Sequence, residues 1–241
     1  MKQSLAMSEC VIFCLAAFML MYPLQLLALT QGPGYSVQDP SGHSYQIADI
    51  VPPFDDPQQM NAAMAWLGHT LKNNHWKAHP LTPRADRYGR LMARVRSMAQ
   101  DDLAESMLRA GHAMVAFDIP DPKRAAKLLA IETDARQSQR GIWASRTTLP
   151  FDKAEAKTGR YVQVEGRVVR VDHHKGHIFL AFGEDWRTDP TGFIPAGAAP
   201  RFSQNDLMQY AGKNVRLRGW LEEQNGPSIL LVQPYAIEML P

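Results

Sequence analysis

The sequence predicts a mainly β protein with some α-helix, arranged as two small β-barrels in tandem. Two observations support this fold class: the length of the chain and the spacing of its strands. With 241 residues the chain is long enough for two cores, since a domain commonly takes about 100 to 150 residues. Beyond residue 30, short runs of alternating apolar and polar residues are separated by turns, and only a few segments have the apolar spacing of a helix.

Composition is that of an ordinary globular protein. Hydrophobic residues make up 45% of the chain and charged residues 21%, which argues against disorder. Lys and Arg number 26 against 24 Asp and Glu, so the net charge of +2 excludes a strongly basic nucleic-acid coat. Any affinity for a polyanion must therefore come from a local cluster of basic side chains.

Residues 1–30 predict export. The stretch from Val11 to Leu29 carries no charge, as in a signal peptide or a single uncleaved membrane anchor. Pro23 and Gln25 argue against a membrane-spanning helix, and the end of the apolar stretch lacks a clean small-x-small cleavage site, which argues against a signal peptide. Both alternatives therefore stay open, and a buried core helix is a third. We expect residues 31–241 to be exported, either periplasmic or anchored in the inner membrane facing the periplasm, with membrane association through residues 11–29.

The first predicted domain spans residues 31–145. A strand over His43–Val51 ends at two prolines, which cannot continue a ladder. A helix then starts at Pro57 behind a capping Asp56, and a later helix starts behind Asp121 in the same way. Between them the pattern predicts strands around residues 74–82 and 88–95, a short helix that stops at Gly111, and a strand over residues 112–117.

The second predicted domain spans residues 159–241, after a linker at 146–158 that has no periodicity. About five strands and one short helix around Gln204–Tyr210 favour a Greek-key barrel of the oligonucleotide/oligosaccharide-binding (OB) kind. In its first strand the apolar parity switches between Val164 and Val169, and Gly166 predicts a bulge there.

Three motifs in the first domain occur together. The stretch D-R-Y-G-R (86–90) is followed by "LAESMLRAGHAMVAF" (103–117) and then by "ETDARQSQRGIWA" (132–144). In this order and spacing they resemble the staphylococcal-nuclease-like, or thermonuclease, family over about residues 32–145. The resemblance implies an OB-type five-stranded barrel with three helices, a bacterial origin, and, in active members, calcium-dependent hydrolysis of DNA or RNA.

The resemblance implies a site of two arginines on the phosphate, two aspartates on Ca²⁺ and one glutamate that positions water. Arg90 matches one of the arginines and is the candidate phosphate contact. The family's R-L-x-x-(V/I)-D-x-P-E stretch falls on residues 46–54, where Gln46, Val51 and Phe54 occupy the arginine, aspartate and glutamate positions. Shifting this alignment by one residue places Tyr45, Ile50 and Pro53 at the arginine, aspartate and glutamate positions instead. The second aspartate should fall near residues 32–34, where "GPG" has no carboxylate.

Without fixed carboxylates a hard divalent ion has no anionic ligands. We therefore predict an exported thermonuclease-like protein that has lost hydrolysis and binds a protein partner or a polyanion, with no metal site and no cofactor. The alternative is an active exported nuclease with a site rebuilt around Arg90, for which Ca²⁺ would be needed. Asp49, Asp55 and Asp56 lie near the expected strand end, but Asp49 is predicted to face away and Asp56 to cap a helix. Asp39 belongs to a predicted turn.

Four further residues are candidates for binding. Arg87, Tyr88, Arg94 and Trp76 could form a phosphate-tracking, base-stacking surface with Arg90. The competing interpretation is a solvated barrel edge.

Other clusters have simpler interpretations. The sequence "HHKGH", with His173, His174 and His177, predicts a polar hairpin tip, with a metal site as the alternative. Arg216, Arg218 and Trp220 alternate along one strand and predict either a binding face or a domain interface. Glu132 and Arg136 are four residues apart on a helix and predict an ordinary surface pair.

Overall fold

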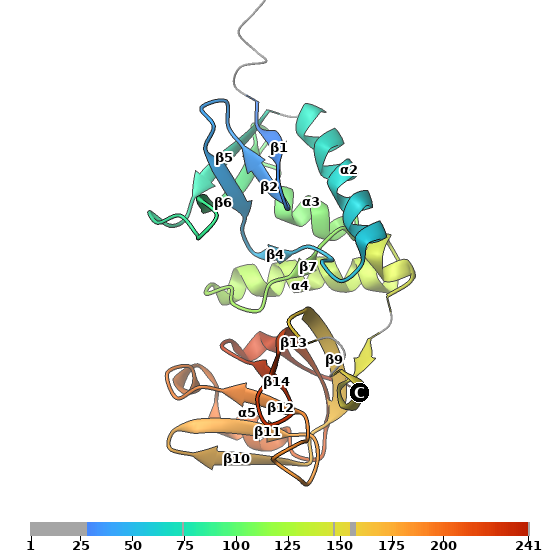
Figure 1. The fold of residues 1–241 in the computed structure, drawn as a ribbon, viewed down its shortest axis with the longest axis vertical. Helices are drawn as coiled ribbons and strands as arrows, with labels where there is room; N and C mark the ends of the chain where they lie inside the picture. The colour runs from blue at the N-terminus through green and yellow to red at the C-terminus, as the bar shows by residue number, and fades with distance from the viewer. Residues whose placement is uncertain (1–27, 74, 147, 155–157, 241) are drawn as a thin grey trace, which may run out of the picture. The chain divides into compact units, whose positions relative to one another are not determined.

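The computed structural model describes residues 28–73, 75–146, 148–154 and 158–240 (Figure 1). It confirms a mainly β protein with helices. Contacts divide the chain into two compact units: the first joins residues up to 48 with 64–104, and the second joins 49–63 with 105–241. This division differs from the boundary at 146–158 expected from the sequence, and the domain boundaries stay a prediction.

The first unit contains one sheet of five strands in the order β1-β2-β3-β6-β5. The strands are β1 (Thr30–Gly32), β2 (Ser36–Gln38), β3 (Ser44–Ile47), β6 (Arg90–Ser97) and β5 (Trp76–Pro80). Strands β3 and β6 run parallel, and the other neighbours are antiparallel. Along β3 and β6 the buried side chains alternate with more exposed ones, so one face of this ladder carries the core and the other is more open.

The predicted strand over His43–Val51 is broken in the structure. Strand β3 ends at Ile47, and Ile50–Val51 form a separate strand, β4, which pairs with β7 (Met114–Val115). Asp49 lies between them with a φ of 70°, in the left-handed region that Asp tolerates better than most residues. A strand cannot pass through such a residue, which explains the break.

Both long helices start as predicted. Helix α2 (Pro57–Asn73) follows Asp56, whose Oδ1 accepts hydrogen bonds from the backbone N–H groups of Gln58 and Gln59. Helix α4 (Pro122–Gln137) follows Asp121, whose carboxylate accepts from Lys123 and Arg124 in the same way. In each helix the first position is proline, which lacks an N–H that would otherwise need a partner.

Two shorter helices complete the set among the described residues. Helix α3 (Leu103–Arg109) ends shortly before Gly111, which has a φ of 71° that favours glycine. Helix α5 (Gln204–Gln209) lies where the short helix of the second domain was expected. The described residues include no helix that is both long and apolar enough to cross a membrane. Most of the predicted signal or anchor, residues 1–27, lies outside the described residues.

The second unit contains an eight-stranded sheet. Its order is β10-β11-β12-β14-β13-β9-β8, with β15 also paired to β13. These strands are β8 (Leu149–Pro150), β9 (Tyr161–Arg167), β10 (Arg170–His174), β11 (His177–Ala181), β12 (Thr191–Ile194), β13 (Asn214–Glu223), β14 (Pro227–Leu230) and β15 (Ile237–Met239). The ladder has two ends and is not a closed barrel in the described residues.

The bulge predicted at Gly166 is not found at this residue. Gly166 still pairs with Val215, and the break between β9 and β10 falls at Val168 and Val169. Gly166 serves a different purpose, because a Cβ atom there would lie 2.7 Å from the ring of Phe182. The absence of a side chain therefore allows this ring to approach the strand.

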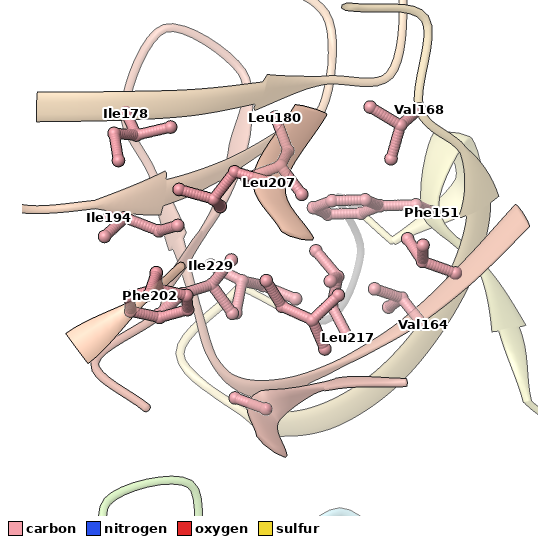
Figure 2. Close-up of a cluster of buried hydrophobic side chains, with 14 of the residues drawn as sticks. Phe151, Val164, Val168, Ile178, Leu180, Ile194, Phe202, Leu207, Leu217 and Ile229 are labelled. Carbon is pink, nitrogen blue, oxygen red and sulfur yellow. The ribbon is translucent and has the colours of Figure 1, made fainter. Parts of the chain in front are cut away.

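A hydrophobic core lies on one face of this sheet (Figure 2). Phe151, Val164, Ile178, Leu217 and Ile229 come from distant parts of the chain and point toward a common centre. Phe151 also makes an edge-on ring contact with Phe182, with centroids 4.8 Å apart. The β-rich C-terminal region thus has a core of its own.

Candidate functional site

Arg90 lies at the start of β6, at the end of a tight loop formed by the D-R-Y-G-R motif. The Oδ1 of Asp86 accepts hydrogen bonds from the backbone N–H groups of Tyr88 and Arg90, each at 2.9 Å. The other carboxylate oxygen pairs with the Arg90 guanidinium, at 2.9 Å from Nε and 2.8 Å from Nη2. The backbone N–H of Arg90 and its guanidinium both hold the pKa of Asp86 below its ordinary value.

Tyr88 stands out from this loop and is 66% exposed. The guanidinium groups of Arg87 and Arg90 lie over its ring, at 4.9 Å and 5.0 Å from the centroid. Three of the residues predicted to bind therefore lie together as an exposed group of two cations and one aromatic ring. Arg94 lies four residues beyond Arg90 on β6, and side chains four apart on a strand share a face.

Trp76 corrects the predicted binding surface. Its side chain is only 2% exposed, and its indole N–H donates to the carbonyl of Thr70 at 3.1 Å. A buried ring cannot stack on a base. Trp76 was a candidate because it is an aromatic residue of the same predicted domain as the arginine-rich stretch, and the sequence did not reveal which face of β5 is covered.

Gln46, at the position of the second family arginine, lies on β3 beside β6. In the parallel register Ser44 is the partner of Arg90 and Gln46 the partner of Met92, so Gln46 and Arg90 lie on the same face of the ladder. The Gln46 amide points back to the carbonyl of Tyr35, at 3.5 Å. In the alignment that assigns the second family arginine to residue 46, its position therefore lies on the same face as Arg90 and carries no charge.

The positions of the family aspartate and glutamate hold apolar side chains. Val51 is 8% exposed on β4. Phe54 is 43% exposed, with its ring centroid 6.3 Å from that of Trp220. In the alternative register Ile50 is buried as well. Neither alignment supplies a carboxylate for a metal or for water activation.

The nearby carboxylates have structural partners. Asp49 pairs with Arg124 at 3.0 Å, and both side chains are less than a tenth exposed. Asp55 makes a bidentate ion pair with Arg146, with N–O distances of 3.0 and 3.2 Å. Asp56 caps helix α2, as predicted. Each of these carboxylates holds part of the second unit together.

Asp39 and the "GPG" segment also form turns. Asp39 accepts hydrogen bonds from the backbone of Ser41 and His43 and from the hydroxyl of Tyr45. Gly34 has a φ of 60° in the turn between β1 and β2, and the Ser36 hydroxyl donates to the carbonyl of Pro33. The turn predicted at Asp39 is therefore present.

These residues do not fit a calcium ion. Ca²⁺ requires several oxygen ligands, usually including fixed carboxylates. Within the part of the chain that the structure describes, no group of three or more His, Cys, Asp or Glu could hold a metal ion. The donor set of a calcium-dependent nuclease is thus missing from these positions.

Part of strand β13 is buried against helix α4, whereas Trp220 on the same strand is 37% exposed. Arg218 is 2% exposed and pairs with Glu132 of helix α4, which is 1% exposed, at 3.0 and 3.2 Å. Glu132 also accepts hydrogen bonds from the backbone of Val115 and from the Gln163 amide. Burial alone would lower the pKa of Arg218, but the Glu132 carboxylate raises it above its ordinary value.

Two expectations about this region are corrected. Glu132 and Arg136 are not a surface pair: Glu132 is buried against Arg218, and Arg136 reaches Gln163 and Glu238 at 3.5 Å. Arg216 pairs with Glu165 and Glu238. The arginines of β13 are thus engaged in ion pairs inside the second unit, and neither the predicted binding face nor a domain interface is observed for them. Helix spacing alone could not reveal the buried pair, because Arg218 lies 86 residues away from Glu132.

The histidine cluster forms a hairpin tip, as predicted, with Lys175 and Gly176 in the turn. His174 lies opposite His177, whereas His173 lies opposite Ile178. His173 and His177 therefore point to opposite faces of the hairpin. The alternative of a metal site built on this pair is wrong.

A cleft on the second unit was missed by the sequence analysis. It has a volume of about 710 Å³ and is lined by one face of β10, β11 and β12 together with the loop that contains Trp186. The signal was present in the alternation of His177, Phe179 and Ala181, which places two rings on one face of a strand. Taken alone, the same alternation is also that of an ordinary β-strand.

Comparison with known proteins supports the resemblance seen in the sequence. Residues 56–145 match the family described as Staphylococcal nuclease homologue. This part of the chain is therefore similar to the thermonuclease family, whose domain is of the OB-fold type. The match begins at Asp56, after the segment that holds Gln46, Val51 and Phe54. A search of curated proteins found no match to the chain.

Proposed function

We propose that this thermonuclease-like protein has lost calcium-dependent phosphodiester hydrolysis and serves as a binding scaffold. One observation supports the proposal: when the family's R-L-x-x-(V/I)-D-x-P-E stretch is aligned with residues 46–54, its arginine, aspartate and glutamate fall on Gln46, Val51 and Phe54. The carboxylates beside this segment, Asp49 and Asp55, are engaged in ion pairs. Removing one preorganised charge from a transition state costs about 3 kcal/mol. Because several such groups are absent, we expect the rate of hydrolysis to be lower by many powers of ten, even if their contributions are not additive.

The retained surface supports a binding role. Arg87, Tyr88 and Arg90 form an exposed group in which an aromatic ring is flanked by two guanidinium groups. Such a group can contact a phosphate and stack on a base, or dock on an acidic face of a protein. Its ligand is therefore a polyanion or a protein partner.

We further propose that each half of the chain is an OB-type barrel. In the C-terminal half, β9 and β10 are separated by only Val168 and Val169, so both ends of the path β10-β11-β12-β14-β13-β9 belong to nearly continuous chain. A single bent strand of this kind is how a small Greek-key barrel brings its two edges together.

The proposed location is the bacterial cell envelope. The uncharged stretch from Val11 to Leu29 supports export, either into the periplasm or on an inner-membrane anchor that faces it. Mass spectrometry of the mature chain distinguishes the two, because an N-terminus beyond Leu29 excludes the anchor.

Calcium and polyanion titrations test the proposed function. We expect calorimetry of the purified full chain to show no saturable Ca²⁺ binding below millimolar concentration. Micromolar Ca²⁺ binding would mean that a metal site has been rebuilt and would overturn the proposal.

The binding surface is tested by fluorescence anisotropy with labelled single-stranded DNA and with heparin. If the partner is a polyanion, Tyr88→Ala should weaken binding, whereas Met98→Ala, an exposed residue just beyond the end of β6 in the same unit, should not. If neither polyanion binds, the scaffold's partner is a protein.

A further inference from the structure

The cleft on the second unit lies on the face of the sheet opposite the core. The antiparallel register pairs Asp172 with Phe179, and Phe179 with Phe193, so these side chains form one row across β10, β11 and β12. The residues that alternate with them, such as Ile178, Leu180 and Ile194, point into the hydrophobic core (Figure 2). The aromatic row is thus not needed for the core of this sheet.

Three rings form a continuous floor. The Phe179 and Phe193 centroids are 5.3 Å apart, and His177 stacks on Phe193 at 5.4 Å with an angle of 27° between the planes. Trp186, which is 59% exposed, stands in the loop between β11 and β12 and also lines the cleft. Large aromatic side chains held at the mouth of a cleft are typical of ligand-binding sites.

The wall with Trp186 is held in a defined conformation. Asp189 accepts a hydrogen bond from the backbone N–H of Asp185, and Asp185 accepts one from the N–H of Arg187. The Arg187 guanidinium lies over the Trp186 ring at 5.2 Å. A loop with these contacts presents its indole at a low entropic cost to a ligand.

The polar groups of the cleft are mostly uncharged or acidic. Gln224, Asn225, Thr191 and Ser228 line it and offer amides and hydroxyls, which can both donate and accept hydrogen bonds. Its two carboxylates, Asp172 and Asp189, outnumber its single guanidinium, Arg170.

Arg170 is already engaged. Its Nε donates to Asp172 at 2.7 Å, and its Nη1 lies 3.7 Å from a Glu184 oxygen. A nucleic acid gains most of its affinity from cations that neutralise its phosphates. This cleft has no excess of cations and would place two carboxylates close to a phosphate chain, which disfavours a polyanion.

We propose that this cleft binds a neutral oligosaccharide. The C–H faces of a sugar ring are apolar and weakly positive, and they fit the negative faces of Phe179, Phe193 and Trp186. Its hydroxyl groups both donate and accept hydrogen bonds, which matches the carboxylates, amides and hydroxyls of the rim. The volume of about 710 Å³ is in the range of small-ligand sites.

Isothermal titration calorimetry of the purified full chain tests this proposal, with chitopentaose, cellopentaose and maltopentaose as probes. At least one should bind, with an affinity that is unchanged between 50 and 500 mM NaCl because the ligand has no charge. Trp186→Ala should weaken binding about tenfold or more, and Phe179→Ala should do the same. Met208→Ala, which removes an exposed apolar side chain of the same unit outside the cleft, should leave the affinity unchanged.

Three results would overturn the proposal. The first is that none of the three pentasaccharides binds at millimolar concentration. The second is binding that Trp186→Ala leaves intact in a variant shown to be folded by circular dichroism; because Trp186 is exposed, its removal should not disturb the fold. The third is that (dT)15 binds through Trp186 and Phe179, with a steep dependence on salt, while the pentasaccharides do not. That outcome would make the cleft a nucleic-acid site.

Discussion

Glu132 shows how one side chain can connect distant parts of the sequence. It lies on helix α4, and its carboxylate meets Arg218 of β13, the Gln163 amide of β9 and the backbone of Val115. A buried charge without a partner is costly, whereas a paired and hydrogen-bonded one is tolerated. The glutamate and the arginine therefore depend on each other.

Replacing this glutamate should destabilise the protein strongly. Glu132→Gln keeps the shape but leaves Arg218 buried without a counter-charge, and we expect a loss of about 3–5 kcal/mol in the free energy of unfolding. Asp134→Asn on the same helix is the matched control, because its pair with Arg140 is exposed and should contribute about 1 kcal/mol or less. Urea denaturation measures both, and equal effects would contradict the role given to Glu132.

His112 should make stability depend on pH. Burial lowers the pKa of His112 below its ordinary value of 6.5. As the pH falls below about 6.5 the unfolded chain takes up a proton that the folded chain does not, so this contribution to stability is present above that pH and declines below it.

The measurement is the free energy of unfolding at pH 7.5 and at pH 5.5, for the natural chain and for His112→Gln. The variant should lose less stability between the two pH values, by up to about 1.4 kcal/mol for each pH unit in the affected range. Parallel losses in both proteins would show that His112 does not contribute.

At the scale of elements, the segment that ends the thermonuclease-like region is tied to the C-terminal sheet. Helix α4 contacts β13 and β9 through Glu132, and the hydroxyl of Tyr161 donates to the carbonyl of Val115 on β7. The Tyr235 hydroxyl donates to the carbonyl of Ala116 and accepts from the N–H of Ile119. These contacts lie within one compact unit.

A truncated chain that stops at Ser145 should therefore fail to fold cooperatively. It keeps the whole region that matches the nuclease family but loses the partners of Glu132, Val115 and Ala116, which would leave buried polar groups unsatisfied. Circular dichroism and thermal melts of residues 28–145 and 28–241 compare the two. A sharp melt of the shorter chain would contradict the dependence.

Much of the local structure could be predicted from the sequence because local rules decide it. Asp56 and Asp121, each followed by proline, begin α2 and α4 as expected, and Gly176 forms the expected hairpin turn. The local pattern did not predict the break at Asp49, because nothing in it indicates a positive φ there or the pair that Asp49 forms with Arg124, 75 residues away.

The candidate site was predicted only in part, for the same reason. Arg87, Tyr88 and Arg90 lie together because a single loop carries them, and the sequence shows that loop. The burial of Trp76 and the cleft floor of Phe179 and Phe193 depend on which face of a strand is covered. Alternation identifies the two faces of a strand but not which one meets the core.

At the scale of the whole molecule, the chain combines a thermonuclease-like region with a β-rich C-terminal region. The first contains the D-R-Y-G-R loop with Arg90, and the segment before the match holds Val51 and Phe54 where the sequence alignment expects a Ca²⁺ ligand and the water-positioning carboxylate. The second has a core of its own and an aromatic cleft on the other face of its sheet. In our account both regions bind and neither hydrolyses.

Hydrolysis of single-stranded DNA and RNA by the purified full chain tests this account most directly, with Ca²⁺, Mg²⁺ or a chelator and with Arg90→Ala in parallel. We predict no cleavage above that of Arg90→Ala in any condition, in samples shown to be folded. Metal-dependent cleavage that Arg90→Ala abolishes would contradict the account, because it would require carboxylates that hold a metal near Arg90.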